Sequence, residues 1–405
     1  MDGDDATMLV SGLLLTAAVL SAATSAVFFI EILAAVGFAR PQFALPPRAV
    51  ARRVAVLVPA HNESTGVLPT LADIRRQLLA GDRLLVVADN CTDDTAAAAA
   101  AHGAEVIERN DATKRGKGYA LEFGVRHLGS DPPEVVIIVD ADCRLADDSI
   151  DQLARACAMT GRPAQALNLM TAPRDSQIEH QVAEFAWRVK NWLRPLGLDA
   201  MKLPCQLMGT GMAFPWAVIN AVELGNGCIA EDLILGLEMA AAGHPALFCP
   251  TARVTSQFPA LRAGAVTQRR RWEHGHIDTI LTAAPHLLTR AVVHRDWCLL
   301  ALSLDVAVPP LSLLGTLVVG IVGASALAAH LGCSAAAFCV SVASLLALSA
   351  GTFLAWLKCG RDVLPPWALL LIPAYVIGKF GFYGQFLWQG AESRWLRTDR
   401  RTSSE

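Results

Sequence analysis

The sequence predicts an α/β domain with a mostly parallel sheet, flanked by transmembrane helices. Two observations predict this class. Long uncharged segments lie towards both ends of the chain, and between them apolar runs alternate with segments of helical spacing. The composition agrees, because 53% of the 405 residues are hydrophobic and the mean hydropathy is +0.40, which is high for a soluble protein. The net charge of −3 gives no basis for nucleic-acid binding.

Four apolar stretches carry the membrane prediction. Met8 to Ile30 and Ala335 to Leu357 are long enough to cross about 30 Å of hydrocarbon. The stretch from Cys298 to Leu331 is long enough too, but Pro309-Pro310 predicts that the residues before it form a separate or kinked helix. The fourth stretch, Trp367 to Trp388, is rich in aromatic residues and is expected to lie in the interface as an amphipathic helix.

Basic residues near the spans predict the orientation. Three of the first five residues are aspartates, whereas Arg40, Arg48, Arg52 and Arg53 follow the first span. By the positive-inside rule, the domain after this span faces the cytoplasm and the N-terminus lies outside. We therefore expect a multi-pass protein of the bacterial inner (cytoplasmic) membrane whose first span is not cleaved. The ten cysteines include no CxxC pair, which suits a reducing compartment.

Short apolar runs and helical spacing predict the elements of the domain. The expected strands are Val54–Val58, Arg83–Ala88, Ala104–Glu108 and Val135–Val139. The expected helices are Leu68–Leu79, Thr95–His102 and Lys117–Leu128. Strands that alternate with helices indicate a parallel sheet covered on both faces. No GxGxxG follows the first strand, so the usual dinucleotide fingerprint is missing.

Acidic residues stand where two of these strands end. Asp140 and Asp142 follow the strand that ends at Val139, and Asp89 follows the second strand. Ligands of open α/β sheets bind at this edge. Two carboxylates one residue apart can hold a hard divalent cation, which can in turn hold a diphosphate. The acids therefore indicate a nucleotide held through a metal ion. The alternatives are solvated loop acids and, for Asp89, an Asx-type helix cap.

Six motifs in a fixed order carry a resemblance to a known family. They are Pro59-Ala-His-Asn-Glu63, Asp89, Arg115-Gly-Lys-Gly118, Asp140-Ala-Asp142, Glu231-Asp232 and Gln268-Arg-Arg-Arg-Trp272. Followed by membrane segments, they resemble the membrane-embedded family 2 glycosyltransferases, the branch of cellulose, chitin and hyaluronan synthases and ceramide glucosyltransferases. The resemblance runs from Val54 to His276 and implies a Rossmann-like fold of the GT-A type.

The resemblance also implies a division of the chain into four parts. These are an N-terminal transmembrane helix (1–40), a cytoplasmic GT-A catalytic domain (50–260), amphipathic interfacial helices with the QxxRW motif (261–300), and C-terminal transmembrane and interfacial helices with a basic tail (301–405).

On the donor side, the resemblance implies that Asp142 ligates Mg²⁺ or Mn²⁺ on the sugar-nucleotide diphosphate. Asp140 is the second candidate ligand or a contact of the ribose or sugar. Asp89 is expected at the uracil and ribose, because a carboxylate accepts hydrogen bonds from both. The other expected donor contacts are Pro59, His61 and Glu63 in the first loop, and Arg115 and Lys117. For the two basic residues, the alternative is a solvated turn.

On the acceptor side, the resemblance implies that Asp232 is the general base, with Glu231 beside it. A single base with direct displacement implies inversion at the anomeric carbon. The family often has Thr before this pair, where the chain has Ala230. The alternative is a pair of acids that complement the dipole at a helix start.

The QxxRW motif places three side chains on one helical face. The resemblance implies that Gln268 and Arg271 bind the donor, and that Trp272 lies beneath the acceptor sugar. Gly209 and Thr210 are expected in the acceptor-side loop. The alternative for the motif is an Arg/Trp helix anchored at lipid headgroups. We expect His274 and His276 to make polar contacts rather than to bind a metal. Phe185 to Leu198 has the pattern of an amphipathic helix that lies on the membrane or packs on the domain.

The predicted activity is transfer of a sugar from a UDP-sugar to a hydroxyl of a lipid-linked or saccharide acceptor, for cell-surface glycolipid or exopolysaccharide synthesis. A processive polysaccharide synthase is an alternative, but few membrane helices make a poor channel unless a homo-oligomer supplies more walls. A nucleotidyltransferase would lack the membrane flanks. A non-catalytic membrane scaffold on a decayed transferase fold is disfavoured, because all three acid sites are present.

Overall fold

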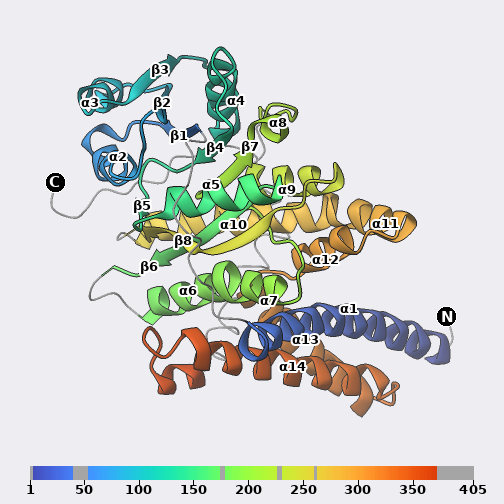
Figure 1. Cartoon of the computed structure of the whole chain (residues 1–405). Coiled ribbons are helices and arrows are strands. Elements are labelled where there is room, and N and C mark those ends of the chain that lie inside the picture. The colour runs from blue at the N-terminus through green and yellow to red at the C-terminus, as the bar shows by residue number, and fades with distance from the viewer. Residues whose placement is uncertain (1–2, 40–52, 174–177, 226–229, 260–261, 372–405) are drawn as a thin grey trace.

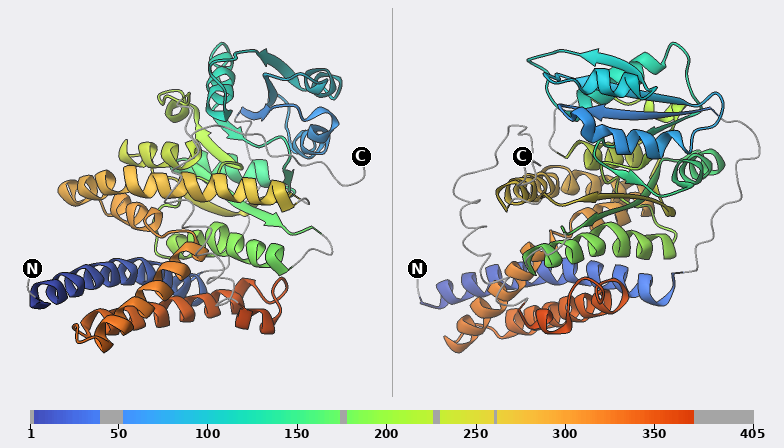
Figure 2. Two further views of the ribbon diagram at one scale, coloured as in Figure 1. Left: turned by 180° about the vertical axis from the view of Figure 1, so that it is seen from behind. Right: turned by 90° about the vertical axis from the view of Figure 1, so that its left-hand side faces the viewer.

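The structure is a computed structural model that describes residues 3–39, 53–173, 178–225, 230–259 and 262–371. An α/β domain lies over a layer of long apolar helices, with shorter helices between the two (Figure 1). The views in Figure 2 show the same separation from the back and from the side. An α/β domain between long apolar helices is thus observed, and the placement of these helices in a membrane stays a prediction.

One mixed sheet of eight strands forms the centre of the domain, in the order β3-β2-β1-β4-β7-β6-β8-β5. Its first half is parallel. It consists of β1 (Val54–Ala60), β2 (Arg83–Asp89), β3 (Glu105–Arg109) and β4 (Val135–Ile138). All four strands had been expected within one or two residues of these bounds. Strands β1, β2 and β4 each contain a continuous run of buried apolar residues, whereas β3 is only partly buried.

The second half of the sheet is mixed. It consists of β5 (Arg144–Leu145), β6 (Ala164–Thr171), β7 (Met212–Pro215) and β8 (Leu247–Gln257). Strand β7 runs antiparallel to both β4 and β6, whereas β6 and β8 are parallel to each other. The sheet is therefore less purely parallel than the alternation in the first half suggested. The antiparallel insertion brings the loop before β7 next to the end of β4.

Helices cover both faces of the sheet, as predicted. One apolar core joins the sheet to α2 (Leu68–Arg75), α3 (Thr95–Ala101) and α5 (Ser149–Thr160). The other joins it to α4 (Lys117–Leu128), α8 (Trp216–Ile219) and α9 (Glu231–Ala241). A short turn of 3-10 helix, Ser64–Val67, precedes α2. Helix α4 has the predicted bounds, while α2 ends before the predicted Leu79.

Among the described residues, three helices are long and apolar enough to cross a membrane. They are α1 (Gly3–Gly37), α13 (Leu311–His330) and α14 (Ala336–Cys359), which lie side by side in Figure 1. Hydroxyl pairs join them: Ser25 Oγ lies 2.9 Å from Ser344 Oγ, and Ser325 Oγ lies 3.0 Å from Ser341 Oγ. Buried hydroxyl pairs of this kind are common between membrane helices.

One end of each of the three helices lies at the side that carries the domain. Ser11 in α1 contacts Ser334, just before α14, and Phe28 lies against Gly351, so α1 and α14 run parallel. Helix α13 leads back from the domain to the start of α14. The end of α1, the start of α13 and the end of α14 therefore meet at the side that carries the domain (Figure 1).

Helices α10 (Arg262–Thr282), α11 (Ala284–His294) and α12 (Trp297–Val306) lie between the domain and the long helices. The predicted break at Pro309-Pro310 is confirmed, because α12 and α13 are separate helices on either side of it. Of the predicted interfacial stretch Trp367 to Trp388, only the start is described, within the 3-10 helix Pro366–Leu371. The rest lies outside the described residues.

The amphipathic stretch Phe185 to Leu198 packs between the domain and the long helices. It forms the end of α6 (Ile178–Arg188), a turn of π-helix (Val189–Leu193) and α7 (Arg194–Ala200). One apolar core joins it to α1, α13 and α14. Helix α7 approaches α1 very closely, because a Cβ on Gly197 would lie only 1.9 Å from the Glu31 carbonyl oxygen. Only glycine permits this contact.

Candidate active site

The predicted site residues gather around one cavity of about 610 Å³ at the ends of the parallel strands. The donor-side residues that line it are Pro59, His61, Glu63, Asp89, Arg115, Lys117, Asp140, Asp142 and Arg271. The acceptor-side residues that line it are Gly209, Thr210, Glu231, Asp232 and Trp272. Gln268 is the exception among the predicted residues. It is 2% exposed and lines a neighbouring cavity instead.

Asp89 is held by a residue that the sequence did not single out. Its Oδ1 accepts hydrogen bonds from Arg109 Nη1 at 2.6 Å and from Asn90 Nδ2 at 3.0 Å. Arg109 also lies over the Tyr119 ring, with 5.6 Å between guanidinium carbon and ring centroid. The helix-cap alternative for Asp89 is wrong, because Asp93 Oδ1 accepts from the backbone N–H of Thr95 at the start of α3. Asp89 lines the cavity, and its ionised carboxylate can only accept hydrogen bonds.

The first loop is joined to the loop after β2 by hydrogen bonds. His61 Nδ1 lies 2.7 Å from the Asp89 carbonyl oxygen, and Thr92 N–H donates to Asn62 Oδ1 at 2.7 Å. Asn62 and Asn90 have φ angles of 55° and 51°, a conformation that costs energy for residues other than glycine. Such backbone persists where the surroundings hold it, and here two such residues border the cavity.

Asp140 lies between a cation and a hydroxyl that fix its position. Its Oδ1 is ion-paired with Lys117 Nζ, and its backbone N–H donates to Thr210 Oγ1 at 3.0 Å. Lys117 Nζ also donates to the Gly209 carbonyl oxygen at 2.6 Å. Burial alone would lower the pKa of Lys117, but Asp140, Glu231 and Asp232 outweigh it and raise the pKa. Lys117 is therefore a permanent cation amid three carboxylates.

The donor atoms beside the strand end fit a hard divalent cation. The carboxylates of Asp140 and Asp142 and the Cys143 thiol lie within 4.8 Å of one another. Burial raises the pKa of the Cys143 thiol to about 12, and hard divalent cations prefer oxygen ligands to sulfur. Two carboxylates remain, which suits Mg²⁺ or Mn²⁺ with water and phosphate oxygens completing the shell. Asp140 is ion-paired with Lys117, and direct metal ligation by Asp142 stays a prediction.

Gly209 and Thr210 lie next to the acidic residues of the site and help to position them. Thr210 is 4% exposed, and its hydroxyl accepts from the backbone of Asp140. This contact favours a positioning role, and acceptor binding by Thr210 stays a prediction. Gly209 has a φ of +85°, and a Cβ there would lie 3.3 Å from Asp232 Oδ2. Glycine therefore both permits the backbone turn and leaves room for the carboxylate.

Glu231 and Asp232 form the start of α9, as predicted. Burial raises the pKa of Glu231 to about 7, and the neighbouring Asp232 carboxylate adds to the effect. Burial also raises the pKa of Asp232, while Lys117 and Lys190 oppose the rise. A carboxyl whose pKa lies near neutrality is well suited to proton transfer at physiological pH.

Lys190, in the π-helical turn, is a second cation near Asp232. Burial lowers its pKa, while Asp232 works in the opposite direction. Its Nζ lies 3.5 Å from His276 Nδ1, and His276 Nε2 lies 2.9 Å from the Val306 carbonyl oxygen. Burial lowers the pKa of His276 to about 3, so the ring is neutral, with Nε2–H donating to the carbonyl. His276 thus makes satisfied polar contacts, as expected.

The QxxRW motif lies on α10 and divides between two cavities. Arg271 reaches the donor cavity, and burial lowers the pKa of its guanidinium. The Trp272 ring lies 4.8 Å from the Trp187 ring, centroid to centroid, with 43° between the planes. Trp272 borders both cavities, whereas Gln268 borders only the second. Donor binding by Gln268 stays a prediction, although its position favours a role outside the donor cavity.

Two functional candidates were missed by the sequence reasoning. Arg109 follows directly on the predicted third strand, and strand pairing places it opposite Asp89. A basic residue at a strand end beside an acidic one was the available signal. Lys190 gave no local signal beyond the amphipathic pattern, because its place depends on a turn of π-helix, a feature often found at functional sites.

Comparison with known proteins agrees with this geometry. Residues 51–275 match the family described as "Glycosyltransferase like family 2". Over 89 residues the chain is 42% identical to uncharacterized glycosyltransferases of Mycobacterium tuberculosis and Mycobacterium bovis. That stretch is 22% of this chain and 36% of each relative, so the match spans about a third of the relatives' length.

A solved structure shows the same fold. A mannosyltransferase from Pyrobaculum calidifontis in complex with GDP-Man and Mn²⁺ has a TM-score of 0.53 at 19% identity. The likeness covers 85% of this chain and 98% of that one, so it includes the membrane-side helices. A glucosyl-3-phosphoglycerate synthase from Mycobacterium tuberculosis, in complex with Mn²⁺, UDP-glucose and phosphoglyceric acid, has a TM-score of 0.34 at 20% identity over 51% of this chain and 71% of that one.

The predicted fold class is thus confirmed as a GT-A fold, with a mixed, Rossmann-like sheet and long apolar helices. The family match covers more than half of the 405 residues. The chain therefore belongs to the glycosyltransferase family 2-like proteins.

Proposed function

We propose that the protein is an inverting, metal-dependent glycosyltransferase. It moves a sugar from a UDP-sugar to a hydroxyl of a lipid-linked or saccharide acceptor at the cytoplasmic face of the membrane. The observation that carries the proposal is the single cavity that brings the three acid sites together with Lys117 and Arg271. Acids alone would suit many cation sites, but cations on the same wall suit a diphosphate held through a metal.

The donor is held by groups on two sides of the cavity. Asp89, fixed by Arg109, accepts hydrogen bonds from the nucleotide, and Asp142 with Asp140 holds Mg²⁺ or Mn²⁺. When bound, the metal neutralises charge on the diphosphate oxygens. Lys117 and Arg271 add positive charge where the UDP oxyanion departs, and both line the same cavity.

The transfer step needs one base. Asp232 accepts the proton of the acceptor hydroxyl while that oxygen forms a bond to the anomeric carbon. The bond from this carbon to the UDP oxygen breaks on the opposite side, so the configuration inverts. Glu231 and Lys117 interact electrostatically with Asp232. Gly209 has no side chain and so leaves space beside the Asp232 carboxylate.

The membrane arrangement supports a cytoplasmic, multi-pass placement. The domain end of α1 precedes Arg40, and the domain end of α14 carries Lys358. Both basic flanks thus belong to the side that holds the domain, as the positive-inside rule requires of a cytoplasmic face. The acidic N-terminal residues belong to the opposite end of α1.

A processive synthase remains the second candidate, because the QxxRW motif on α10 borders the donor cavity. Three candidate spans among the described residues make few walls for a hydrated pore, so a single chain favours transfer of one or a few sugars. A scaffold without activity is disfavoured, because the carboxylates, Lys117 and Arg271 still face one cavity.

Incubation of the purified protein with radiolabelled UDP-sugars and a bacterial lipid extract tests the function. We expect label to enter a lipid or saccharide fraction only when Mg²⁺ or Mn²⁺ is present, and chelation to stop it. Asp142→Asn is expected to lower metal affinity or activity by about 100-fold, because an amide oxygen binds a hard cation less well than a carboxylate.

Asp147→Asn is the matched control, because Asp147 is exposed and does not line the cavity. It should behave as the wild type. Transfer that proceeds equally well after chelation would contradict the metal role. No release of UDP from any UDP-sugar would contradict the donor class.

The rate should fall as the pH falls, and the fall should begin at a higher pH than for an ordinary aspartate, because burial raises the pKa of Asp232. Asp232 must be ionised to accept a proton, and because the pKa of this pair is raised, the ionised form is lost at a higher pH than for an ordinary carboxyl. Glu231→Gln removes the neighbouring negative charge and should move the acidic limb of the pH–rate profile to lower pH. An acidic limb of the wild-type pH–rate profile near the ordinary pKa of a carboxyl side chain would contradict this expectation.

A further inference from the structure

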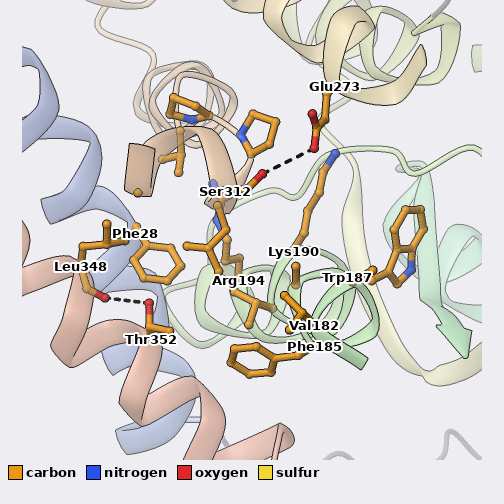
Figure 3. Close-up of a pocket in the computed structure, with 18 of the residues that line it drawn as sticks. Phe28, Val182, Phe185, Trp187, Lys190, Arg194, Glu273, Ser312, Leu348 and Thr352 are labelled. Carbon is orange, nitrogen blue, oxygen red and sulfur yellow. Dashed lines mark hydrogen bonds between the residues drawn. The ribbon is translucent and has the colours of Figure 1, made fainter. Parts of the chain in front are cut away.

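A second cavity, of about 410 Å³, lies between the domain and the membrane helices. Its size falls within the range of ligand pockets, roughly 300–1,000 Å³. Figure 3 shows its walls, which come from α1, α6, the π-helical turn, α10, α13 and α14. The donor and the metal do not need this space, because their residues line the other cavity.

The two cavities share a wall. Five side chains line both, namely Trp187, Lys190, Arg194, Trp272 and His276. The tilted pair of Trp187 and Trp272 lies at this boundary, with the Trp272 ring placed where the acceptor was predicted. The second cavity therefore adjoins the donor cavity on its acceptor side, which also carries Asp232.

Polarity changes along the second cavity. Near the shared wall, Lys190 extends towards Glu273, and Ser312 Oγ donates to Glu273 Oε1 at 3.5 Å (Figure 3). On the far side, Phe28 and Leu348 present apolar surface and are 1% and 6% exposed. The wall is thus polar where it meets the donor cavity and apolar among the membrane helices.

The backbone and hydroxyls on the far side offer few free donors to a ligand. Pro309 and Pro310 line the cavity at the break between α12 and α13, and proline has no N–H. Thr352 Oγ1 donates to the Leu348 carbonyl oxygen at 2.8 Å, so its hydroxyl is already satisfied within α14. An apolar chain fits such walls, whereas a hydrated sugar chain would lose hydrogen bonds to water without regaining them.

We propose that this cavity holds the apolar chain of the acceptor, which is therefore a lipid with a hydroxyl-bearing head. The head passes Trp187 and Trp272 and presents its hydroxyl to Asp232, while the chain lies against Phe28, Leu348 and Val319. The proposal rests on the proposed function and narrows its acceptor from a lipid-linked or saccharide compound to a lipid. The same walls disfavour a path for a growing polysaccharide.

Val319→Phe fills the cavity from α13, where Val319 is one of its lining residues. Leu317→Phe is the matched control, because Leu317 is 45% exposed on the same helix and does not line the cavity. Ser349→Phe, from α14, is an independent second filling variant. Retained UDP binding by each variant shows that the domain is folded.

The reagent is 1-hexadecanol with a diazirine at mid-chain, added to the full-length protein in lipid nanodiscs and irradiated. Mapping by peptide mass spectrometry should find label on the parts of α13 and α14 that line the cavity. Labelling there should fall about tenfold in Val319→Phe and Ser349→Phe, a change that corresponds to 1.4 kcal/mol in binding, and stay at the wild-type level in Leu317→Phe. Transfer of sugar to lipid should fall in the same variants.

Equal labelling in all variants would overturn the proposal. Equal labelling by the diazirine hydrocarbon that lacks the hydroxyl would also overturn it, because the cavity would then hold ordinary bilayer lipid. If Asp232→Asn abolishes transfer while Val319→Phe and Ser349→Phe retain it, the proposed function stands and the lipid cavity is wrong. If Asp232→Asn retains transfer, the proposed base is wrong, and the labelling pattern still decides the cavity.

Discussion

Asp232→Asn is expected to lower kcat by about 10²–10⁴-fold, the usual contribution of a general base. The amide has nearly the same shape as the carboxylate but cannot accept the acceptor proton. UDP-sugar affinity should change little, because the donor contacts attributed to Asp89, Asp142 and Arg271 remain. Release of UDP from radiolabelled UDP-sugar in purified membranes measures the rate, and calorimetry with UDP measures the affinity.

Glu238→Gln is the matched control on the same helix. Glu238 is exposed and lies outside the donor cavity, so the same exchange of carboxyl for amide should leave the rate unchanged. An Asp232→Asn protein with wild-type UDP release would show that Asp232 is not the base. A large loss of UDP affinity would instead assign Asp232 to donor binding.

Arg194→Met is expected to destabilise the folded protein by about 3–5 kcal/mol, the cost of breaking a buried ion pair from one side. Arg194 Nε donates to Glu31 Oε2 at 2.6 Å, and its Nη2 is paired with Asp305. The three side chains are 6%, 3% and 5% exposed. Without Arg194, two carboxylates remain buried with no cation between them. Gln206 still donates to Asp305 Oδ2 at 2.6 Å, but this neutral amide does not replace the lost charge.

Thermal unfolding of the detergent-purified protein measures this effect as a lower midpoint. Arg126→Met is the control, because Arg126 forms an exposed i,i+4 pair with Glu122 and such pairs contribute at most about 1 kcal/mol. Combining Arg194→Met with Glu31→Gln and Asp305→Asn should recover part of the loss, because the buried charges are then removed. Equal midpoints for Arg194→Met and Arg126→Met would show that the cluster is not stabilising.

The first half of the domain could be predicted from the sequence because its signals are local. The strand before Asp140 is a continuous apolar run, and α4 begins after Gly116, whose φ of +135° suits a helix start after a turn. Parallel strands then place Asp89 and Asp140 at one sheet edge without any knowledge of long-range contacts. The motif order supplied the rest of the site.

The second half was hidden by buried polar residues. Strand β6 contains Gln165 and Asn168, which are 0% and 3% exposed and do not show the pattern of a buried strand. Gln165 Nε2 donates to the Thr210 carbonyl oxygen, and Asn168 Nδ2 donates to the Met208 carbonyl oxygen. The side-chain amide nitrogens of both residues are paired with carbonyl oxygens forty or more residues away, and no local pattern reveals such partners.

The membrane part was predictable in length and not in arrangement. Apolar length alone indicates α1, α13 and α14. The parallel pairing of α1 with α14, the π-helical turn at Lys190 and the second cavity all arise from contacts between distant segments. Arg109 beside Asp89 belongs to the same class, because only strand pairing makes them neighbours.

The backbone contact at Gly197 fixes the distance between α7 and α1. Where the backbone of α7 rests on the Glu31 carbonyl, no side chain or water separates the domain from the first membrane helix. This direct backbone contact would also set the distance of Asp232 from the hydrocarbon of the membrane. Acceptors would be selected by where along the membrane normal they carry their hydroxyl, and a spacer of a few ångströms between lipid and head would place it beyond reach.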